Sequence, residues 1–447
     1  MHRFRFAVVA AVVAVGALVS ACSGGSSGGS GSDPNAVANE VTMWTSNIAW
    51  MPYQNASLAA FTKATGIKVN VNAIPVADIL DKELIAQRAH SSDFAMYEGP
   101  TSLISQDVGV MGGVPITPLV SNTKLTSSSF NINDFTELGN CSLNGTLYCL
   151  PTFIDGAILA YNPKLLAQAG ISSPPQNWQD LLTDANAVTQ KTGTPGFCTR
   201  GSQAGAAIAT FHFGLAYFIP YSKQNKGFMV GPNWNSLLDS PGAVQWATEF
   251  QTLMTKDAPR GIGSYGTTEC LNAFDQGKTA MVWEGITSYS GNEMNPPADS
   301  PLHGNVGFTA LNCPTSSPCM PLGPWGMFIN PHAPKAQQNA AWKLMQFLES
   351  PSFITQSINA THYPGLAVLK SVATQTFAGV PQSYVAAASY VAQHSEPEAF
   401  PPTTVFNQSQ QDEQIAISQL ISGTPPAKAM QFAAQGQNSV FQQAGLG

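Results

Sequence analysis

One short segment constrains the fold of this chain more than any other: residues 67–72 alternate strictly between apolar and polar side chains. Such alternation is typical of a β-strand with one buried face. The surrounding pattern predicts, in order, a strand at 41–46, a helix at 58–63 ending near Gly66, the strand at 67–72, a helix at 77–90 and a strand at 93–98. A β-α-β-α-β succession favours an α/β fold with a mostly parallel sheet flanked by helices.

A second α/β region begins near Pro151. Ser240 and Pro241 mark one helix start there, as the N-cap and the first helical residue. The other predicted elements are strands at 158–161, 279–284, 306–310 and 327–329, and helices at 163–169, 178–191, 203–218, 336–348, 351–358, 411–421 and 427–441. A chain of 447 residues is long enough for two or three domains.

The composition excludes two broad classes of protein. Charged residues make up only 10% of the chain, and its formal net charge is −7. No cluster of Lys and Arg is present to neutralise a run of phosphates, so we expect no nucleic-acid partner. Aromatic residues make up 9% of the chain, which argues against intrinsic disorder.

The N-terminus predicts export. Arg3 and Arg5 precede a short apolar stretch at 6–19 that ends in small residues, as in a secretory signal peptide rather than a membrane-spanning helix. Residues 19–22 resemble a bacterial lipobox, which implies a signal peptide at 1–21 and lipidation of Cys22. Ordinary signal cleavage, with Cys22 as an incidental thiol, is the alternative. Residues 22–36, with their Gly/Ser run, then form a tether from the outer face of the bacterial cytoplasmic membrane.

Six further cysteines fit an exported protein with disulfides. Six cysteines allow 15 pairings. Short separations favour Cys141–Cys149 and Cys313–Cys319, which leaves Cys198–Cys270. A zinc site is the alternative, but the chain has no Cys-x-x-Cys and no His-Glu-x-x-His motif. We therefore expect no metal and no cofactor.

Five segments resemble, in order, those of the extracellular solute-binding proteins of ABC importers, the family that includes maltose-binding protein, in its sugar and polyol branch. They are Asn-Gly-Thr-Leu-Tyr-Cys-Leu-Pro at 144–151, Leu-Ala-Tyr-Asn-Pro-Lys-Leu-Leu at 159–166, Ala-Gly-Ile to Pro-Pro and Trp at 169–178, Phe-Asp-Gln-Gly-Lys-Thr-Ala-Met at 274–281, and Ala-Trp-Lys-Leu-Met-Gln-Phe-Leu at 341–348. The extra cysteines and the Gln/Asn-rich surface depart from the family pattern.

The resemblance implies a two-lobed periplasmic-binding-protein-like fold with a ligand cleft at a hinge. We expect about three crossovers, near 153–156, 276–279 and 325–328. Lobe 1 would comprise 37–154 and 279–325, and lobe 2 would comprise 155–278 and 326–447. The resemblance also implies a monomer that closes on a small-molecule ligand and delivers it to the transmembrane subunits of an ABC permease.

Ligands of open α/β sheets bind beyond the carboxyl ends of strands. Aromatic rings and carboxylates follow the predicted strands, and this combination suits a sugar or polyol, whose C–H face packs on a ring and whose hydroxyls donate to a carboxylate. Asp155 is the firmest candidate, because it lies in the first hinge. The full set is Trp44, Asn47, Trp50, Tyr97, Glu98, Thr101, Phe153, Asp155, Trp283, Glu284, Gly323, Trp325 and Gly326.

Each candidate has a structural alternative. The tryptophans would serve equally well in core packing, and for Trp178, Trp246 and Trp342 we expect packing because they sit at helical spacing. The carboxylates could end solvated loops. Arg200 follows a predicted strand in Phe-Cys-Thr-Arg-Gly and resembles the Arg-Gly segment of polyol-binding members. It could donate to hydroxyls or a phosphate, or be a surface residue paired with Glu269 or Asp275. Tyr265, Gly266 and Thr267, which precede a predicted helix at 268–278, could also line the cleft.

Other functions remain open at this point. Aromatic rings with carboxylates also form cages for amines or quaternary ammonium groups, and Arg200 with helix N-termini would suit a glycerophosphodiester. A secreted glycosidase using Glu98 and Glu284 would need its carboxyls about 5–10 Å apart. We expect no catalytic residue, because no nucleophile elbow is present. A lipoprotein that binds another protein is the third class.

Overall fold

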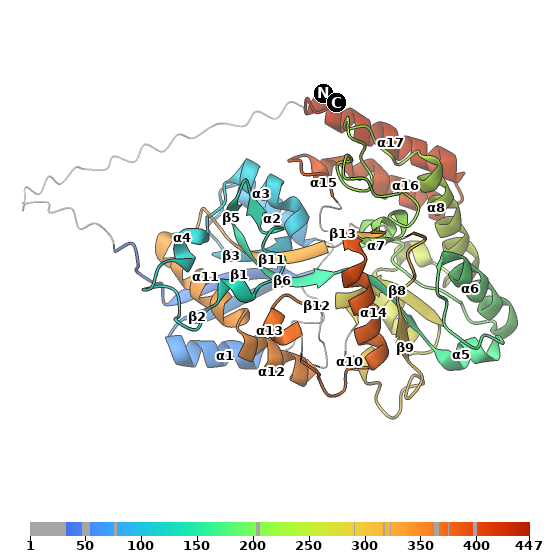
Figure 1. Ribbon diagram of the computed structural model, residues 1–447, viewed down its shortest axis with the longest axis horizontal. Helices are drawn as coiled ribbons and strands as arrows, with labels where there is room; N and C mark the ends of the chain where they lie inside the picture. Colours follow the sequence, from blue (N-terminus) through green and yellow to red (C-terminus); the bar gives the residue numbers. More distant parts are fainter. Residues whose placement is uncertain are drawn as a thin grey trace, which may run out of the picture. The chain divides into compact units, whose positions relative to one another are not determined.

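The computed structural model describes residues 33–46, 54–75, 78–202, 206–289, 291–315, 318–321, 323–361, 366–373, 375–396 and 400–447. Cys22 and the signal peptide lie outside these residues, as do Asn47 and Trp50. Residues 35–447 form one compact unit, which is two-lobed, with a sheet in each lobe (Figure 1). No helix of the described part of the chain is long and apolar enough to cross a membrane.

The first lobe is built on a six-stranded sheet with the order β12-β6-β11-β3-β1-β2. Its strands are β1 (Glu40–Ser46), β2 (Lys68–Ile74), β3 (Met96–Pro100), β6 (Cys149–Asp155), β11 (Gly323–Ile329) and β12 (Leu366–Ala367). The predicted β-α-β-α-β unit is confirmed, since β2 and β3 both pair in parallel with β1. The sheet is nevertheless mixed rather than mostly parallel, because β11 runs antiparallel between β3 and β6.

Helices and one hairpin surround this sheet. The helix α11 packs on β1 and β11, and α1 on β2. The helices are α1 (Gln54–Thr65), α2 (Ile79–Arg88), α3 (Ile104–Met111), α4 (Thr117–Val120), α11 (Lys335–Leu348), α12 (Pro351–Thr361) and α13 (Lys370–Ala373), and the hairpin is β4 (Ser142–Leu143) with β5 (Thr146–Leu147). Gly66 ends α1 as predicted: its φ is +74° and its N–H donates to the carbonyl of Thr62 at 2.8 Å.

The second lobe is built on a three-stranded sheet in which β7 (Ala157–Tyr161) lies between β8 (Met281–Gly285) and β9 (Gly307–Thr309). Both pairs are antiparallel, against the expectation of a mostly parallel sheet. Its helices are α5 (Pro163–Gln168), α6 (Trp178–Thr192), α7 (Ala206–Leu215), α8 (Pro241–Thr252), α9 (Thr267–Asp275), α10 (Gly291–Met294), α14 (Gln382–Gln393), α15 (Phe406–Ser409), α16 (Gln411–Ile421) and α17 (Pro426–Gln443), and a short ladder joins β10 (Met320–Pro321) and β13 (Ser395–Glu396).

The chain passes from the first sheet to the second at Gly156, the single residue between β6 and β7, as predicted. The other two passages differ from the prediction. β8 and β9 stay with β7, so the return falls between β9 and β11, and the last passage falls between α13 and α14. The expected lobe assignments of 279–325 and 326–447 are therefore wrong for their strands, because β8 and β9 pair in the second sheet and β11 pairs in the first.

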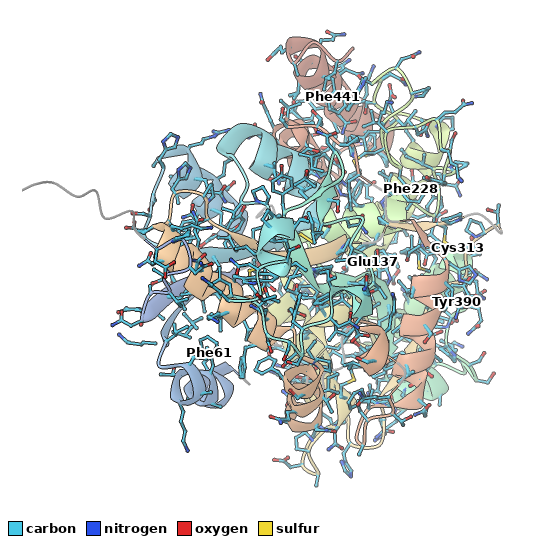
Figure 2. The ribbon with its side chains drawn as sticks, turned by 60° about the vertical axis from the view of Figure 1, so that its left-hand side comes forward. Phe61, Glu137, Phe228, Cys313, Tyr390 and Phe441 are labelled. Atoms are coloured by element: carbon cyan, nitrogen blue, oxygen red, sulfur yellow. A yellow bond between two sulfur atoms is a disulfide. The ribbon has the colours of Figure 1, made fainter. Side chains whose placement is uncertain are left out.

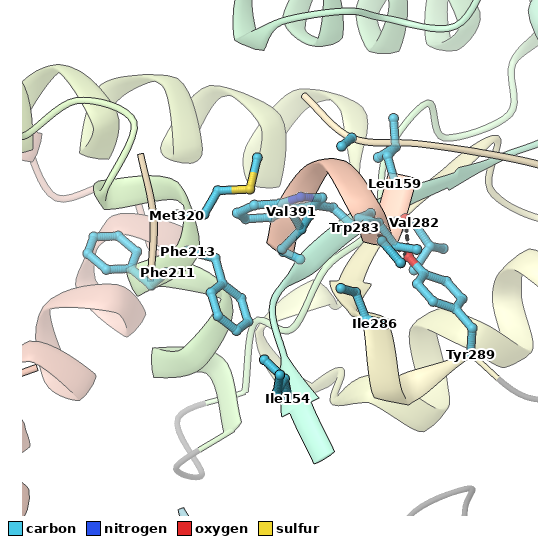
Figure 3. Packing of buried hydrophobic residues seen from close by; sticks show 14 of the residues in the cluster. Ile154, Leu159, Phe211, Phe213, Val282, Trp283, Ile286, Tyr289, Met320 and Val391 are labelled. Carbon is cyan, nitrogen blue, oxygen red and sulfur yellow. Dashed lines mark hydrogen bonds between the residues drawn. The ribbon is translucent and has the colours of Figure 1, made fainter. Parts of the chain in front are cut away.

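Aromatic side chains fill the core of the second lobe. Trp178 packs edge-on against Trp246 and Trp283, with ring centroids 4.7 and 4.9 Å apart. Figure 3 shows Trp283 among the apolar side chains of this core. Trp342, in the first lobe, is also buried, and its indole N–H donates to the hydroxyl of Thr126 at 2.8 Å. Packing roles are thus confirmed for Trp178, Trp246 and Trp342.

All three favoured disulfides are present: Cys141–Cys149, Cys198–Cys270 and Cys313–Cys319. The last lies beside α14, where the backbone N–H of Cys313 donates to the hydroxyl of Tyr390 at 3.0 Å (Figure 2). The first packs on β11. A Cβ added at Gly326 would lie 2.7 Å from Sγ of Cys149, so glycine is required where the disulfide crosses that strand.

Candidate functional site

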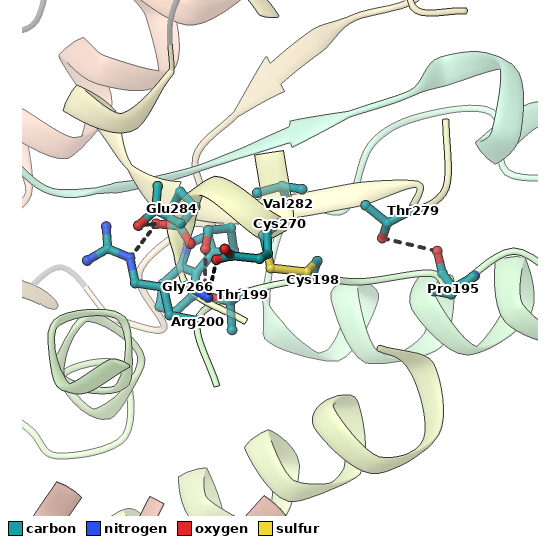
Figure 4. The surroundings of a disulfide bond; sticks show 12 residues. Pro195, Cys198, Thr199, Arg200, Gly266, Cys270, Thr279, Val282 and Glu284 are labelled. Atoms are coloured by element: carbon teal, nitrogen blue, oxygen red, sulfur yellow. Dashed lines mark hydrogen bonds and ion pairs between the residues drawn. A yellow bond between two sulfur atoms is a disulfide. The ribbon is translucent and has the colours of Figure 1, made fainter. Parts of the chain in front are cut away.

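Three charged side chains meet next to the first passage between the lobes: Asp155, Arg200 and Glu284. Arg200 Nε donates to Glu284 Oε2 at 2.6 Å (Figure 4). The side chains of this ion pair are 9% and 0% exposed. Asp155 is close enough to act on the titration of Glu284, and Arg200 acts on both carboxyls. Glu284 thus has its guanidinium partner away from bulk solvent, and the partly buried Asp155 carboxylate lies near enough to feel the same charge.

Strand register explains why these residues meet. Cys198 forms a parallel bridge with Val282 of β8. Two residues further along each segment stand Arg200 and Glu284, which brings the guanidinium beside the carboxylate. The hydroxyl of Thr199 ties the two segments together by donating to the carbonyl of Trp283 at 2.7 Å. The predicted alternative for Arg200, a surface pair with a nearby acid, is replaced by a buried pair with a candidate ligand residue.

Asp155 is placed by a close backbone approach. It is the last residue of β6, and Ala157 pairs with Gly285 just beyond the passage. A Cβ added at Gly285 would lie 2.6 Å from Oδ2 of Asp155, so only glycine leaves room for this carboxylate. The backbone N–H of Thr287 donates to Oδ1 of Asp155 at 3.2 Å. The carboxylate thus has a defined position rather than a solvated loop end.

Three hydroxyl groups surround this cluster; Thr267 was a candidate from the sequence, and Thr287 and Ser288 were not. Ser288 Oγ lies 3.3 Å from a terminal guanidinium nitrogen of Arg200. The Thr267 hydroxyl, at the start of α9, donates to Oε2 of Glu284 at 3.5 Å, and the hydroxyl of Thr287 contacts Asp155. Thr287 and Ser288 follow Glu284 within four residues, so extending the search past each strand end would have found them.

Burial and charge set the titration of the cluster. Burial raises the pKa of Glu284, the Arg200 guanidinium opposes that rise, and the neighbouring Asp155 carboxylate adds to it. Burial likewise raises the pKa of Asp155, again opposed by Arg200. A desolvated carboxylate next to a fixed cation forms stronger hydrogen bonds than one in water. The partly exposed Asp155 carboxylate can therefore accept hydrogen bonds from ligand hydroxyls, while the buried Glu284 holds the guanidinium beside it.

An aromatic pair lies close by in the first lobe. Phe153 of β6 and Trp325 of β11 stack with centroids 5.5 Å apart and an interplanar angle of 19°. The two strands also pair Gly323 with Asp155, so the aromatic stack lies two residues along the ladder from the carboxylate. The hydroxyl of Thr101 holds this strand end by donating to the carbonyl of Pro324 at 3.0 Å. Trp325 keeps part of its surface exposed.

Glu98 lies elsewhere, in the interior of the first lobe. Its side chain is fully buried, and Oε2 accepts a hydrogen bond from the Thr45 hydroxyl at 2.9 Å. Burial raises the pKa of Glu98 to about 8. Glu349, at the end of α11, is buried beside it, and its own pKa is raised well above the usual value by burial and by the charge of Glu98. The prediction that Glu98 faces a ligand is therefore replaced by a core position.

Several other candidates are also core residues. Trp283 is 1% exposed and belongs to the aromatic core of the second lobe. Tyr97 is buried and stacks on Phe328 at 5.2 Å. Trp44 is only partly buried and stacks on Phe94 at 4.3 Å, so it lies at the edge of this core. Gly326 packs on a disulfide, as described above. Tyr265 lies next to the charged cluster, where its carbonyl accepts from the N–H of Gly201 at 2.9 Å.

No group of three His, Cys, Asp or Glu side chains in the described ranges is arranged to hold a metal ion. The candidate site consists of the charged cluster with its hydroxyls, together with the Phe153–Trp325 stack. Its chemistry is that of hydrogen-bond acceptors, one cation and an aromatic face.

The sequence at 45–353 matches the family described as bacterial extracellular solute-binding protein. A probable ABC transporter-binding protein of Deinococcus radiodurans is 25% identical over 52% of this chain, and the match spans only 54% of that relative. An erythritol/L-threitol-binding protein of Mycolicibacterium smegmatis is 23% identical, with 87% of this chain and 83% of the relative covered.

Solved structures share the fold. Maltose-bound MalE3 of T. maritima superposes with a TM-score of 0.76 at 18% identity, covering 89% of this chain and 98% of that one. A solute-binding protein of Agrobacterium radiobacter K84 in complex with ribitol gives a TM-score of 0.75 at 20% identity, with the same coverage of both chains. These likenesses place the described residues in a two-lobed binding-protein fold.

Proposed function

Because the chain belongs to the family of bacterial extracellular solute-binding proteins, we propose that it binds a neutral polyol or sugar between its lobes and delivers it to an ABC permease. The charged cluster at the first passage between the lobes carries this proposal: a buried Arg200–Glu284 pair with the partly buried Asp155 beside it. It combines two acceptors and one donor where a closing lobe can meet a ligand.

Hydroxyl groups match this cluster chemically. A carboxylate accepts from two vicinal hydroxyls at once, and a guanidinium donates along fixed directions. A sugar or polyol also presents C–H faces, which can pack on the exposed part of the Trp325 indole. The relative named for erythritol and L-threitol and the ribitol complex support a polyol, and the maltose complex supports a sugar.

The charge of the cluster argues against an anionic ligand. With both acids ionised, its formal charge is −1, so a phosphodiester would face net repulsion at short range. A cationic ligand would not, and an amine or quaternary ammonium is therefore the alternative that binding experiments must separate from a polyol. Membership of the family also argues for a binding protein rather than a glycosidase.

Delivery requires a difference between an open and a closed form. The ligand stabilises the closed form only by contacting it better than the open form. Gly156 is the single residue between the two sheets at the first passage, and Asp155 beside it would engage the ligand as the lobes approach. We also propose the exported location with a lipid anchor at Cys22, which would keep the protein beside its permease.

Thermal shift followed by calorimetric titration tests this proposal. The probes are erythritol, ribitol and maltose, with choline and glycerophosphocholine as charged competitors. A ligand at 100 times its Kd should stabilise the protein by about 2.7 kcal/mol. Asp155→Ala should abolish the shift, whereas the exposed Asp299→Ala should not alter it. Binding of choline alone, lost in moderate salt, would overturn the neutral-ligand proposal.

A further inference from the structure

The disulfide Cys198–Cys270 lies directly behind the charged cluster (Figure 4). Both cysteines are fully buried. Cys198 stands two residues before Arg200, and Cys270 lies one helical turn after Thr267 on α9. The bond spans a sequence separation of 72 residues. It is the covalent link between the segment that carries the guanidinium and the helix that carries the hydroxyl.

Both of these segments hold the same oxygen atom. Oε2 of Glu284 accepts from Arg200 Nε at 2.6 Å and from the Thr267 hydroxyl at 3.5 Å. Without the disulfide, the distance between the two donors would depend only on how their two segments pack together. The disulfide joins those segments within three residues of each donor.

Backbone contacts hold the same junction on its other side. The N–H groups of Gly201 and Ser202 donate to the carbonyl of Tyr265 at 2.9 and 3.0 Å. A Cβ added at Gly201 would lie 2.3 Å from the carbonyl oxygen of Ile262, so the two segments approach as closely as backbones can. The chain on both sides of Arg200 is thus fixed: the disulfide holds the preceding residues, and a backbone contact holds the following ones.

We propose that Cys198–Cys270 is a positioning element for the ligand site, holding Arg200 and Thr267 on Glu284 so that ligand affinity depends on this disulfide. The expected effect on ligand affinity rests on the proposed function. Its physical basis is preorganisation: a guanidinium already fixed at its partner loses little freedom when a ligand binds, whereas a loosened one must be ordered at that moment.

The test compares two disulfide-free variants by calorimetry with erythritol, ribitol and maltose. Cys198→Ala/Cys270→Ala should bind about tenfold more weakly than the wild type, on the scale of ordering one or two side chains. The control Cys313→Ala/Cys319→Ala should bind within twofold of the wild type although it loses a disulfide as well. Equal binding by the first variant, or equal weakening in both variants, would overturn the proposal.

A double-mutant cycle separates positioning from a general loss of rigidity. Thr267→Val should weaken binding several-fold in the wild type and by less than twofold when Cys198–Cys270 is absent, because the donor is then no longer held in place. Additive losses would contradict coupling through the disulfide. Should the double alanine variant fail to fold, Cys198→Ser/Cys270→Ser provides the second disulfide-free background for the same cycle.

Hydrogen exchange gives a readout without ligand. The amides of Gly201 and Trp283, which donate to Tyr265 and Cys198, should lose protection in the Cys198→Ala/Cys270→Ala variant and keep it in the control. Unchanged protection would overturn the positioning role. If the wild type binds none of the probes while this protection is lost as expected, the proposed ligand class fails and the ordering of Arg200 by the disulfide stands.

Discussion

The buried carboxyl of Glu98 makes the stability of this protein depend on pH in a direction that can be worked out. The pKa of Glu98 is about 8 in the folded protein, raised by burial from a usual value of 4.5. Between these values the folded protein holds a proton that the unfolded chain has released. Stability is therefore fully present below pH 4.5 and falls as pH rises, at about 1.4 kcal/mol per unit.

Across the whole window, this linkage amounts to a loss on the order of 5 kcal/mol. Glu98→Gln removes the titrating group while keeping its size. We expect the variant to resemble the wild type near pH 5, where Glu98 is protonated, and to be the more stable protein by several kcal/mol near pH 8.5.

Urea denaturation at a series of pH values measures the effect, and the difference between variant and wild type removes the contribution of the groups that do not interact with Glu98. Thr45→Val gives a second arm. It deletes the hydroxyl that donates to Oε2 of Glu98 at 2.9 Å and favours its ionised form. The pKa of Glu98 should rise further, and the decline in stability should extend to higher pH. A constant difference between Glu98→Gln and wild type from pH 5 to 8.5 would refute the assigned titration.

Three further outcomes follow from the site. Arg200→Ala should leave the buried Glu284 carboxyl without its cation and lower the unfolding free energy by about 3–5 kcal/mol in urea denaturation; an unchanged midpoint would contradict the buried ion pair. Removing Cys198–Cys270 should cost about 4 kcal/mol and removing Cys313–Cys319 about 2 kcal/mol, because the larger loop gains more entropy when opened; the reverse order in differential scanning calorimetry would contradict this. Gly285→Ala should cost about 1–3 kcal/mol and weaken ligand binding, since its Cβ would displace the Asp155 carboxylate; full affinity by calorimetry would argue against that carboxylate as a ligand.

Much of this fold could be predicted from local patterns in the sequence, because strand alternation and helix caps depend only on neighbouring residues. The alternation at 67–72 gave β2, and Ser240 caps α8 as expected, with its hydroxyl accepting from the N–H of Ala243 at 3.4 Å. Strand partners could not be predicted in the same way. The segments that became β8 and β11 were recognised as strands but assigned to the wrong lobes, since apolar patterning says that a strand has a buried face and not which sheet covers it.

The predicted site residues were limited in the same way, because the sequence does not show which side chains meet in the folded protein. Glu98 and Glu284 look alike in the sequence, each at the carboxyl end of a strand, yet one lies in the core and the other in the charged cluster. What separates them is tertiary: Glu98 faces Thr45 and another acid, Glu349, whereas Glu284 faces Arg200. Burial without a neighbouring cation keeps the Glu98 carboxyl protonated near neutral pH, whereas the Arg200 guanidinium draws Glu284 towards its ionised form.

This contrast bears on the ligand. In a chain with only 10% charged residues, the buried pair of Arg200 and Glu284 has to be stabilised by partners that remain in place when the site empties, and the hydroxyls of Thr267 and Ser288 are such partners. A neutral polyol would extend this network without changing its charge, so its binding should depend weakly on salt. A cation would change the charge of the network, and its affinity should fall as salt screens the two carboxylates. The salt dependence of affinity therefore distinguishes the two ligand classes before the ligand itself is known.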